Sequence, residues 1–286
     1  MHARATLPAL GLALALAAAV PGAATADSPR RTAAGAAPSC GTGVVGQDSS
    51  GRILEHFVRN GRQVRTRRGP RLPQRITGLG YVDVRGKVTR LAATTVGGVP
   101  RMLTLRATGR HRMTASTTPF AQRGFAPVLF TDAYGYFAYS VDRAGVLHRW
   151  VLERGRGGEV RYSGRTRLGA GFAGLTALGT AGRRAKPAAD LLYAVTAGGA
   201  LRLLTVPLAR PRAHTAQTLL RRGYAGVTEL SAGYCVAEGQ DVVIALDPSA
   251  GKATWTLISG LTTRSPSAHQ RGAVRGRADW ALHAVM

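Results

Sequence analysis

Residues 171–178 read GFAGLTAL, and the first three of them form a unit that returns elsewhere in the chain. The same Gly-aromatic-Ala unit stands at residues 124–126 and 223–225, so Phe125, Phe172 and Tyr224 occupy equivalent positions 47 and 52 residues apart. An apolar stretch follows each copy, and a pair of strand-like segments follows that stretch. A period of this length is typical of repeat architectures, in which one copy cannot bury its apolar face alone and packs against its neighbours.

Strand and hairpin signals fill the chain from residue 42 onward. Residues 81–84 and 87–91 carry apolar side chains at alternate positions on either side of a turn at Arg85-Gly86. Asn60-Gly61 is the preferred pair for a tight type I′ turn, because both central residues of that turn need a positive φ. Long helical periodicity is absent beyond the N-terminal apolar segment. The sequence therefore predicts an all-β protein.

The number of repeats indicates the architecture. Three clear copies begin near residues 117, 165 and 216, and residues 40–116 and 261–286 leave room for about two more at this period. A closed ring protects the strand edges that an open stack exposes. We therefore predict a β-propeller over residues 40–286, with five blades of four antiparallel strands and one blade shared by the two termini. A six-bladed ring is the nearest alternative, and a β-sandwich is the next.

Two segments resemble known repeats. The best copy joins residues 171–172 to LYAV at 192–195 and GAL at 199–201, and it resembles the tachylectin-like propeller family. That resemblance implies amino-sugar sites between blades, with Phe125, Phe172 and Tyr224 at the ligand-binding positions, where the family usually has tryptophan. Residues 243–255, VIALDPSAGKATW, resemble the blade repeat of pyrroloquinoline-quinone enzymes. The residues that would stack and hold that cofactor have no counterparts here, so we predict no cofactor.

The N-terminus reads as a signal peptide over residues 1–26. Arg4 supplies the positive start, residues 7–20 are apolar and uncharged, and residues 24–26 give a small-x-small cleavage pattern. The apolar run is too short to cross a bilayer comfortably, and no second run of spanning length follows. Residues 27–39 lack periodicity and are expected to form a flexible leader. The expectation is a secreted, extracellular monomer without a transmembrane segment.

Cys40 and Cys235 are the two cysteines of the chain. An exported protein meets oxidising conditions, so a disulfide between them is the economical prediction. It would join the first ordered residue to the last clear repeat, where a circular fold needs closing. Two separate buried thiols are the alternative.

The chain is strongly basic, with a formal net charge of +25. Such a surface attracts wall polymers, acidic polysaccharide, anionic membrane and, without sequence specificity, nucleic acid. GC-rich coding also produces an arginine-rich composition, and it explains the charge as well as a binding role does. One cluster, over residues 59–75, holds seven arginines and no acid. We select Arg67, Arg68 and Arg71 from it as anion-binding candidates, because guanidinium groups bind phosphate and carboxylate in bidentate fashion; a solvated basic surface is the alternative.

Signals for catalysis are weak. The histidines are isolated, no metal-ligand spacing occurs, and neither a nucleophile elbow nor a phosphate-binding glycine motif is present. Asp132 and Glu229 fall near the ends of corresponding apolar runs in their repeats, and a hydrolase acting in the channel of the ring would need such acids. We favour a turn or an ion pair with arginine as their use. We predict a non-enzymatic, lectin-like binding protein for glycan or anionic cell-wall polymer. The alternatives are a secreted polysaccharide hydrolase and a structural ring that docks other proteins.

Overall fold

The structure is a computed structural model that describes residues 39–96, 100–119, 125, 127–133, 136–155, 160–236, 239–263 and 265–286. The predicted signal peptide lies outside the described residues, as do residues 27–38 of the predicted leader and Gly124 and Ala126 of the first repeat copy. The described part contains nineteen strands and one short 3-10 helix, Pro211–Ala213. All pairings between the strands are antiparallel.

Three of the sheets have four strands each, paired in chain order. The first contains β4 (Ile76–Arg85), β5 (Val88–Thr95), β6 (Arg101–Ala107) and β7 (Met113–Pro119). The second contains β8 (Leu129–Ala133), β9 (Phe137–Val141), β10 (Leu147–Arg154) and β11 (Val160–Gly169). The third contains β12 (Leu175–Arg184), β13 (Ala189–Thr196), β14 (Leu201–Pro207) and β15 (Thr215–Leu220).

The fourth sheet has seven strands and brings the two ends of the chain together, in the order β19-β18-β17-β16-β1-β2-β3. Its N-terminal strands are β1 (Cys40–Gln47), β2 (Arg52–Arg59) and β3 (Arg62–Arg71). Its C-terminal strands are β16 (Glu229–Cys235), β17 (Gln240–Asp247), β18 (Lys252–Ser259) and β19 (Ser267–Ala273). The two groups are joined by two residue pairs, Cys40 with Cys235 and Gly41 with Tyr234.

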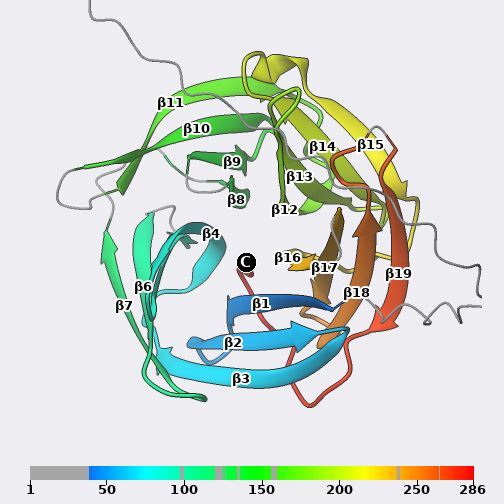
Figure 1. Cartoon of the computed structure of the whole chain (residues 1–286). Coiled ribbons are helices and arrows are strands. Elements are labelled where there is room, and N and C mark those ends of the chain that lie inside the picture. Colours follow the sequence, from blue (N-terminus) through cyan, green and yellow to red (C-terminus); the bar gives the residue numbers. More distant parts are fainter. Residues whose placement is uncertain are drawn as a thin grey trace, which may run out of the picture. The chain divides into compact units, whose positions relative to one another are not determined.

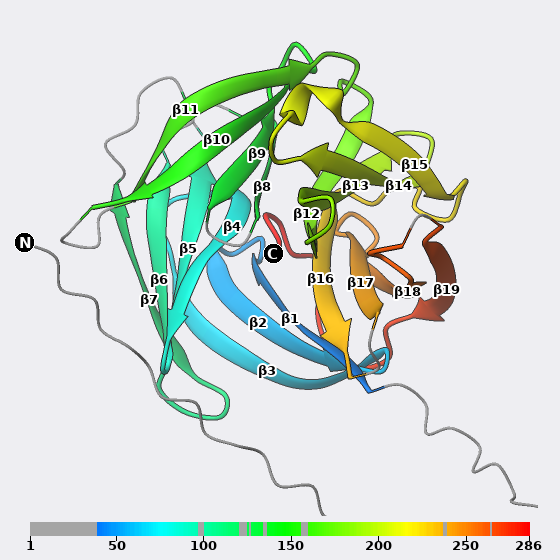
Figure 2. The ribbon, with the colours of Figure 1, turned by 45° about the horizontal axis from the view of Figure 1, so that its top comes forward.

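The sheets formed by residues 40–286 radiate from a common axis (Figures 1 and 2). Strands β1, β4, β8, β12 and β16 lie innermost, and β3, β7, β11, β15 and β19 lie at the perimeter (Figure 1). This is the arrangement of a β-propeller rather than the face-to-face stacking of the β-sandwich alternative. The prediction of an all-β chain built mostly from four-stranded antiparallel sheets is confirmed.

The last residues of the chain extend the seven-stranded sheet on the inner side of β1. Val45 and Met286 exchange backbone hydrogen bonds of 3.2 and 3.0 Å, and Gln47 and His283 exchange bonds of 3.0 and 2.9 Å. The C-terminal segment, residues 283–286, therefore lies antiparallel to β1 and extends the sheet by a short strand-like stretch. The first strand of the described chain, β1, is therefore hydrogen bonded to the last residues of the chain.

Glu229, the first residue of β16, holds this C-terminal segment. Its two carboxylate oxygens accept the backbone N–H groups of Ala284 and Val285, each at 2.9 Å. Burial of the carboxyl group raises the pKa of Glu229 to about 7, although the two N–H donors oppose the shift. Glu229 therefore connects the segment to β16.

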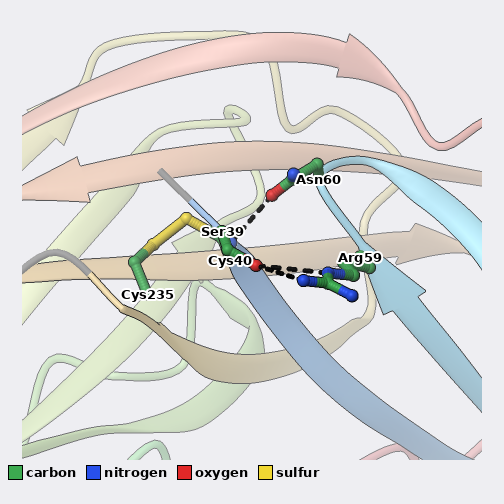
Figure 3. The surroundings of a disulfide bond; sticks show 5 residues. All are labelled: Ser39, Cys40, Arg59, Asn60 and Cys235. Atoms are coloured by element: carbon green, nitrogen blue, oxygen red, sulfur yellow. Dashed lines mark hydrogen bonds between the residues drawn. A yellow bond between two sulfur atoms is a disulfide. The ribbon is translucent and has the colours of Figure 1, made fainter. Parts of the chain in front are cut away.

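The predicted disulfide between Cys40 and Cys235 is confirmed, and it lies where β1 meets β16 (Figure 3). Asn60 supports it from the neighbouring turn: its side-chain oxygen accepts the N–H of Cys40 at 2.7 Å, and its own N–H donates to the carbonyl of Cys40 at 2.9 Å. Asn60 and Gly61 have φ angles of 49° and 68°, so the predicted tight turn is also confirmed. The disulfide covers the shortest strand pairing in the seven-stranded sheet.

Candidate functional site

The Gly-aromatic-Ala unit connects one sheet to the next. The N–H of Phe172 donates to the carbonyl of Gly145 at 3.0 Å, and the N–H of Tyr224 donates to the carbonyl of Gly199 at 3.1 Å. Both acceptors lie in the turn between the second and third strands of the preceding sheet. A Cβ added at Gly145 would lie 2.5 Å from the backbone nitrogen of Ala173, and one added at Gly199 would lie 2.7 Å from that of Ala225. These turns therefore require glycine. The repeated unit therefore has a structural role.

A further copy of this contact was missed by the sequence analysis. The N–H of Leu72 donates to the carbonyl of Gly51 at 2.9 Å, in the same relation to its turn as Phe172 to Gly145. The turn before it begins with Asp48, whose carboxylate accepts two backbone N–H groups, as Asp142 does in its own turn. The aromatic residue is replaced by leucine here, so an Asp-x-x-Gly search would have found the copy and an aromatic search could not.

The three repeated aromatic side chains are buried. Phe125 and Tyr224 are each 1% exposed, and Phe172 is 9% exposed. The Phe125 ring stacks on Tyr162 at a centroid distance of 5.1 Å, and the Tyr224 hydroxyl is hydrogen bonded to Thr256 at 2.5 Å. Protein atoms cover most of the surface of these three side chains. A ligand-binding role for these three side chains stays a prediction.

A basic cavity of about 860 Å³ lies between the outer strands β3 and β7. We call it the β3–β7 groove. Its walls come from Thr66 and residues 68–70 of β3, from Thr108 and residues 111–115 of the β6–β7 hairpin, and from Arg52 of β2. Arg52, Arg68, Arg112 and His111 supply its basic side chains, and no carboxylate belongs to its lining. The groove is a concave surface of one charge sign.

Backbone contacts between the two sheets hold the groove in shape. The N–H of Arg68 donates to the carbonyl of His111 at 3.0 Å, and the His111 ring is hydrogen bonded to the carbonyl of Thr66 at 3.2 Å. The residues Arg68 and Arg112 form a parallel bridge, which brings two arginines together from different sheets. Arg52 donates to the carbonyl of Gly69 at 3.0 Å. The basic groups are therefore positioned by the fold.

The predicted anion-binding arginines have different surroundings. Arg68 lines the groove, whereas Arg67 forms an ion pair with Glu55 at 3.0 Å and lies over the ring of Phe57. Arg71 is exposed at the end of β3, opposite Arg52 in the strand register. The sequence analysis did not select Arg52, His111 or Arg112, because their closeness to Arg68 depends on contact between two sheets. A binding role for Arg67, Arg68 and Arg71 stays a prediction.

The perimeter strands differ in how many charged residues they carry, and this difference bears on why β3 is rich in arginine. Charged side chains on an edge strand discourage aggregation, which alone could explain arginines on β3. Strands β7 and β15 are also at the perimeter, however, and neither carries a charged residue. Five of the ten residues of β3 are arginine. Of the other perimeter strands, β11 carries three arginines and β19 carries one, so β3 is the most basic of the five.

The carboxylates considered for a hydrolase differ in their surroundings. Asp132 lines an axial cavity of about 410 Å³ together with Asp241. Burial raises the pKa of Asp241 to about 6. Glu229 instead uses both oxygens to hold the C-terminal segment.

Across the described residues, no group of three or more His, Cys, Asp or Glu side chains is arranged to hold a metal. No helix among these residues is both long and apolar enough to span a membrane.

No protein-family model matches the sequence, and no curated protein matches it. Among solved structures, the BP39L lectin from Burkholderia pseudomallei is 17% identical, with a TM-score of 0.44, over 82% of this chain and 66% of that chain. The SapL1 lectin, solved in complex with alpha methyl fucoside, is 9% identical, with a TM-score of 0.42, over 84% of this chain and 83% of that chain. This chain thus spans about two thirds of the length of BP39L.

Likenesses this distant carry no argument about a ligand. The resemblances to tachylectin-like proteins and to quinone-enzyme repeats stay predictions.

Proposed function

We propose that the protein binds an anionic polymer, either an acidic glycan or an anionic cell-wall polymer, in the β3–β7 groove and catalyses no reaction on it. The observation that carries this proposal is that Arg52, Arg68 and Arg112 line one cavity whose lining holds no carboxylate. Guanidinium groups bind phosphate and carboxylate in bidentate fashion, and a concave basic surface concentrates anions. Nucleic acid would bind through the same charge without sequence specificity.

We further propose that the ring has five blades. Strands β1–β3 and the C-terminal segment form one group of four hydrogen-bonded stretches, and β16–β19 form a second group of four. These two groups share a pairing of two residues, whereas β1 and β2 pair over seven. On this division the seven-stranded sheet counts as two blades, and both termini contribute to one of them.

We also propose that residues 1–26 are a signal peptide and that the mature chain acts as an exported monomer. The support is the charge and apolar pattern of those residues. A disulfide is stable in the oxidising compartments that exported proteins occupy, and the Cys40–Cys235 bond fits that setting.

A panel of polymers tests the binding proposal. We expect polygalacturonate, which carries carboxylates, and a teichoic acid, which carries phosphates, to bind at low salt, while neutral dextran does not. Three arginine contacts predict that the logarithm of the association constant falls against the logarithm of salt with a slope of roughly 2–3. Fluorescence anisotropy at several salt concentrations measures this slope. Binding of dextran alone, or of none of the three polymers, would contradict the proposal.

Replacing Phe125 with leucine tests the role of the repeated aromatic residues. The substitution keeps most of the buried volume but removes the ring that packs on Tyr162 and Trp150. We expect a loss of about 1–2 kcal/mol in the free energy of unfolding, measured by urea denaturation, because the new side chain fills the site imperfectly. Affinity for the anionic polymer should not change, since the ring lies in the interior. A tenfold weaker affinity in a folded variant would instead assign the ring to ligand binding.

A further inference from the structure

A second surface, apart from the β3–β7 groove, gathers exposed apolar side chains. Eight large apolar side chains are exposed among the described residues, and three of them line a single cavity of about 630 Å³. These are Val64, Tyr234 and Val236, which are 55%, 75% and 78% exposed. Exposed apolar side chains are ordinary when scattered, but a group of them in one cavity marks a surface that binds something.

The backbone fixes this exposure. Val64 is the extra residue of a β-bulge, since Phe57 pairs with Arg65 while Val58 pairs with Gln63. A bulge redirects the side chain that it inserts, which accounts for an outward valine on β3. The N–H of Val236 donates to the carbonyl of Ser39 at 2.9 Å, next to the disulfide.

All three apolar side chains lie at one end of the strands, beside the start of β1 and the β2–β3 turn. Tyr234 belongs to the last part of β16, and Val236 follows that strand directly. The same end of β1 and β16 can be followed in Figure 2, where the two strands converge.

Three arginines, Arg59, Arg65 and Arg110, line the same cavity. The side-chain nitrogens of Arg59 donate to the Ser39 hydroxyl at 3.2 and 3.0 Å (Figure 3), and Arg65 lies 3.8 Å above the ring of Phe57. None of the three forms an ion pair with a carboxylate within the part of the chain that the structure describes. We call this combination of three apolar side chains and three arginines the disulfide-end patch.

We propose that the disulfide-end patch binds the surface of an anionic phospholipid membrane. Tyrosine and aliphatic side chains enter the interface between head groups and acyl chains, and arginines bind the lipid phosphates. Charge complementarity between the three unpaired arginines and anionic head groups selects this partner. The polymer bound by the groove differs from it, because a soluble polyanion would use the arginines but leave the valines in water.

A second copy of this chain fits the patch less well. A two-fold dimer through this surface would cover the valines, but it would gather all six arginines of the two copies in one interface. Like charges gathered together oppose such an interface, whereas an anionic membrane satisfies both kinds of side chain.

Vesicle co-sedimentation tests the proposal. The wild-type chain, folded with its disulfide, is mixed with vesicles of phosphatidylcholine alone or of phosphatidylcholine with phosphatidylglycerol. We expect binding to the mixed vesicles and little binding to the neutral ones. The Tyr234→Ser/Val236→Ser double variant keeps every arginine, and its partition onto mixed vesicles should weaken about tenfold because the inserted apolar surface is lost.

Two matched variants isolate the patch. Val84→Ser/Val96→Ser changes two exposed valines outside the cavity, and Arg68→Ala/Arg112→Ala changes the groove. The first should bind vesicles as the wild type does, and the second should retain the dependence on Tyr234 and Val236 even if the polymer proposal fails. Unchanged vesicle binding by the Tyr234→Ser/Val236→Ser variant would overturn the proposal. So would absence of wild-type binding, or a dimer that this variant converts to monomer in size-exclusion chromatography.

Discussion

Removal of the Cys40–Cys235 disulfide is expected to lower the free energy of unfolding by about 3–5 kcal/mol. The bond closes a loop with a sequence separation of 195 residues, and an unfolded chain without it gains the corresponding conformational freedom. The bond also covers the two residue pairs that join β1 to β16, so the folded ring loses a covalent link where its strand pairing is shortest. Guanidinium denaturation of the oxidised protein and of the Cys40→Ser/Cys235→Ser variant measures the difference.

Hydrogen exchange shows where the loss acts. In the double-serine variant we expect faster exchange in β1 and β16, with central strands such as β5 and β13 changed least, because those strands are hydrogen bonded on both sides within their own sheets. The wild-type protein treated with a reductant is the matched control and should behave as the variant does. Equal denaturation midpoints for the oxidised and reduced proteins would show that the disulfide does not hold the ring closed.

Replacement of Glu229 with alanine is expected to cost about 3 kcal/mol, because two backbone N–H groups of the C-terminal segment lose their acceptors. Glutamine at the same position keeps one accepting oxygen and should cost less. The expected order of denaturation midpoints is therefore wild type, Glu229→Gln, then Glu229→Ala. If the alanine variant matches the wild type, the C-terminal segment is not held through this carboxylate.

The raised pKa of Glu229 adds a pH dependence to the same comparison. In the unfolded chain this carboxyl group loses its proton near pH 4.5, whereas in the folded chain it does so near pH 7. The folded state therefore binds more protons between these values, and stability should fall as pH rises across that window. Asp241, whose pKa is raised to about 6, acts in the same direction at lower pH. The Glu229→Gln variant should show a flatter profile from pH 5 to pH 7 than the wild type, and an unchanged profile would assign the slope to other groups.

Features that depend on residues close together in the chain could be predicted from the sequence. Asn60-Gly61 forms the expected tight turn, and alternation of apolar and polar residues around Arg85-Gly86 gives the β4–β5 hairpin. The disulfide was also predictable, because a chain that is expected to be exported and has two cysteines offers one economical pairing. These predictions depend on local conformation or on residue counts, and neither requires knowledge of how the sheets pack.

Features that depend on contacts between distant segments could not be predicted. Leu72 repeats the linker contact of Phe172 without an aromatic ring, so the residue type concealed the copy. A blade shared by the two termini was expected, but the residues of β1 that pair with the C-terminal segment could not be named from the sequence. The β3–β7 groove depends on Arg112 reaching Arg68 from another sheet, and a charge count along the sequence cannot show that meeting.

Affinity for polygalacturonate and teichoic acid, compared between two double variants at one salt concentration, tests the central claim most directly. Arg68→Ala/Arg112→Ala removes two groove arginines, and Arg202→Ala/Arg271→Ala removes the same charge from exposed positions on β14 and β19. The account predicts that the groove variant binds at least about tenfold more weakly than the wild type, and that the matched variant changes by less than about threefold. Equal weakening in the two variants would contradict it, because binding would then follow net charge rather than the groove.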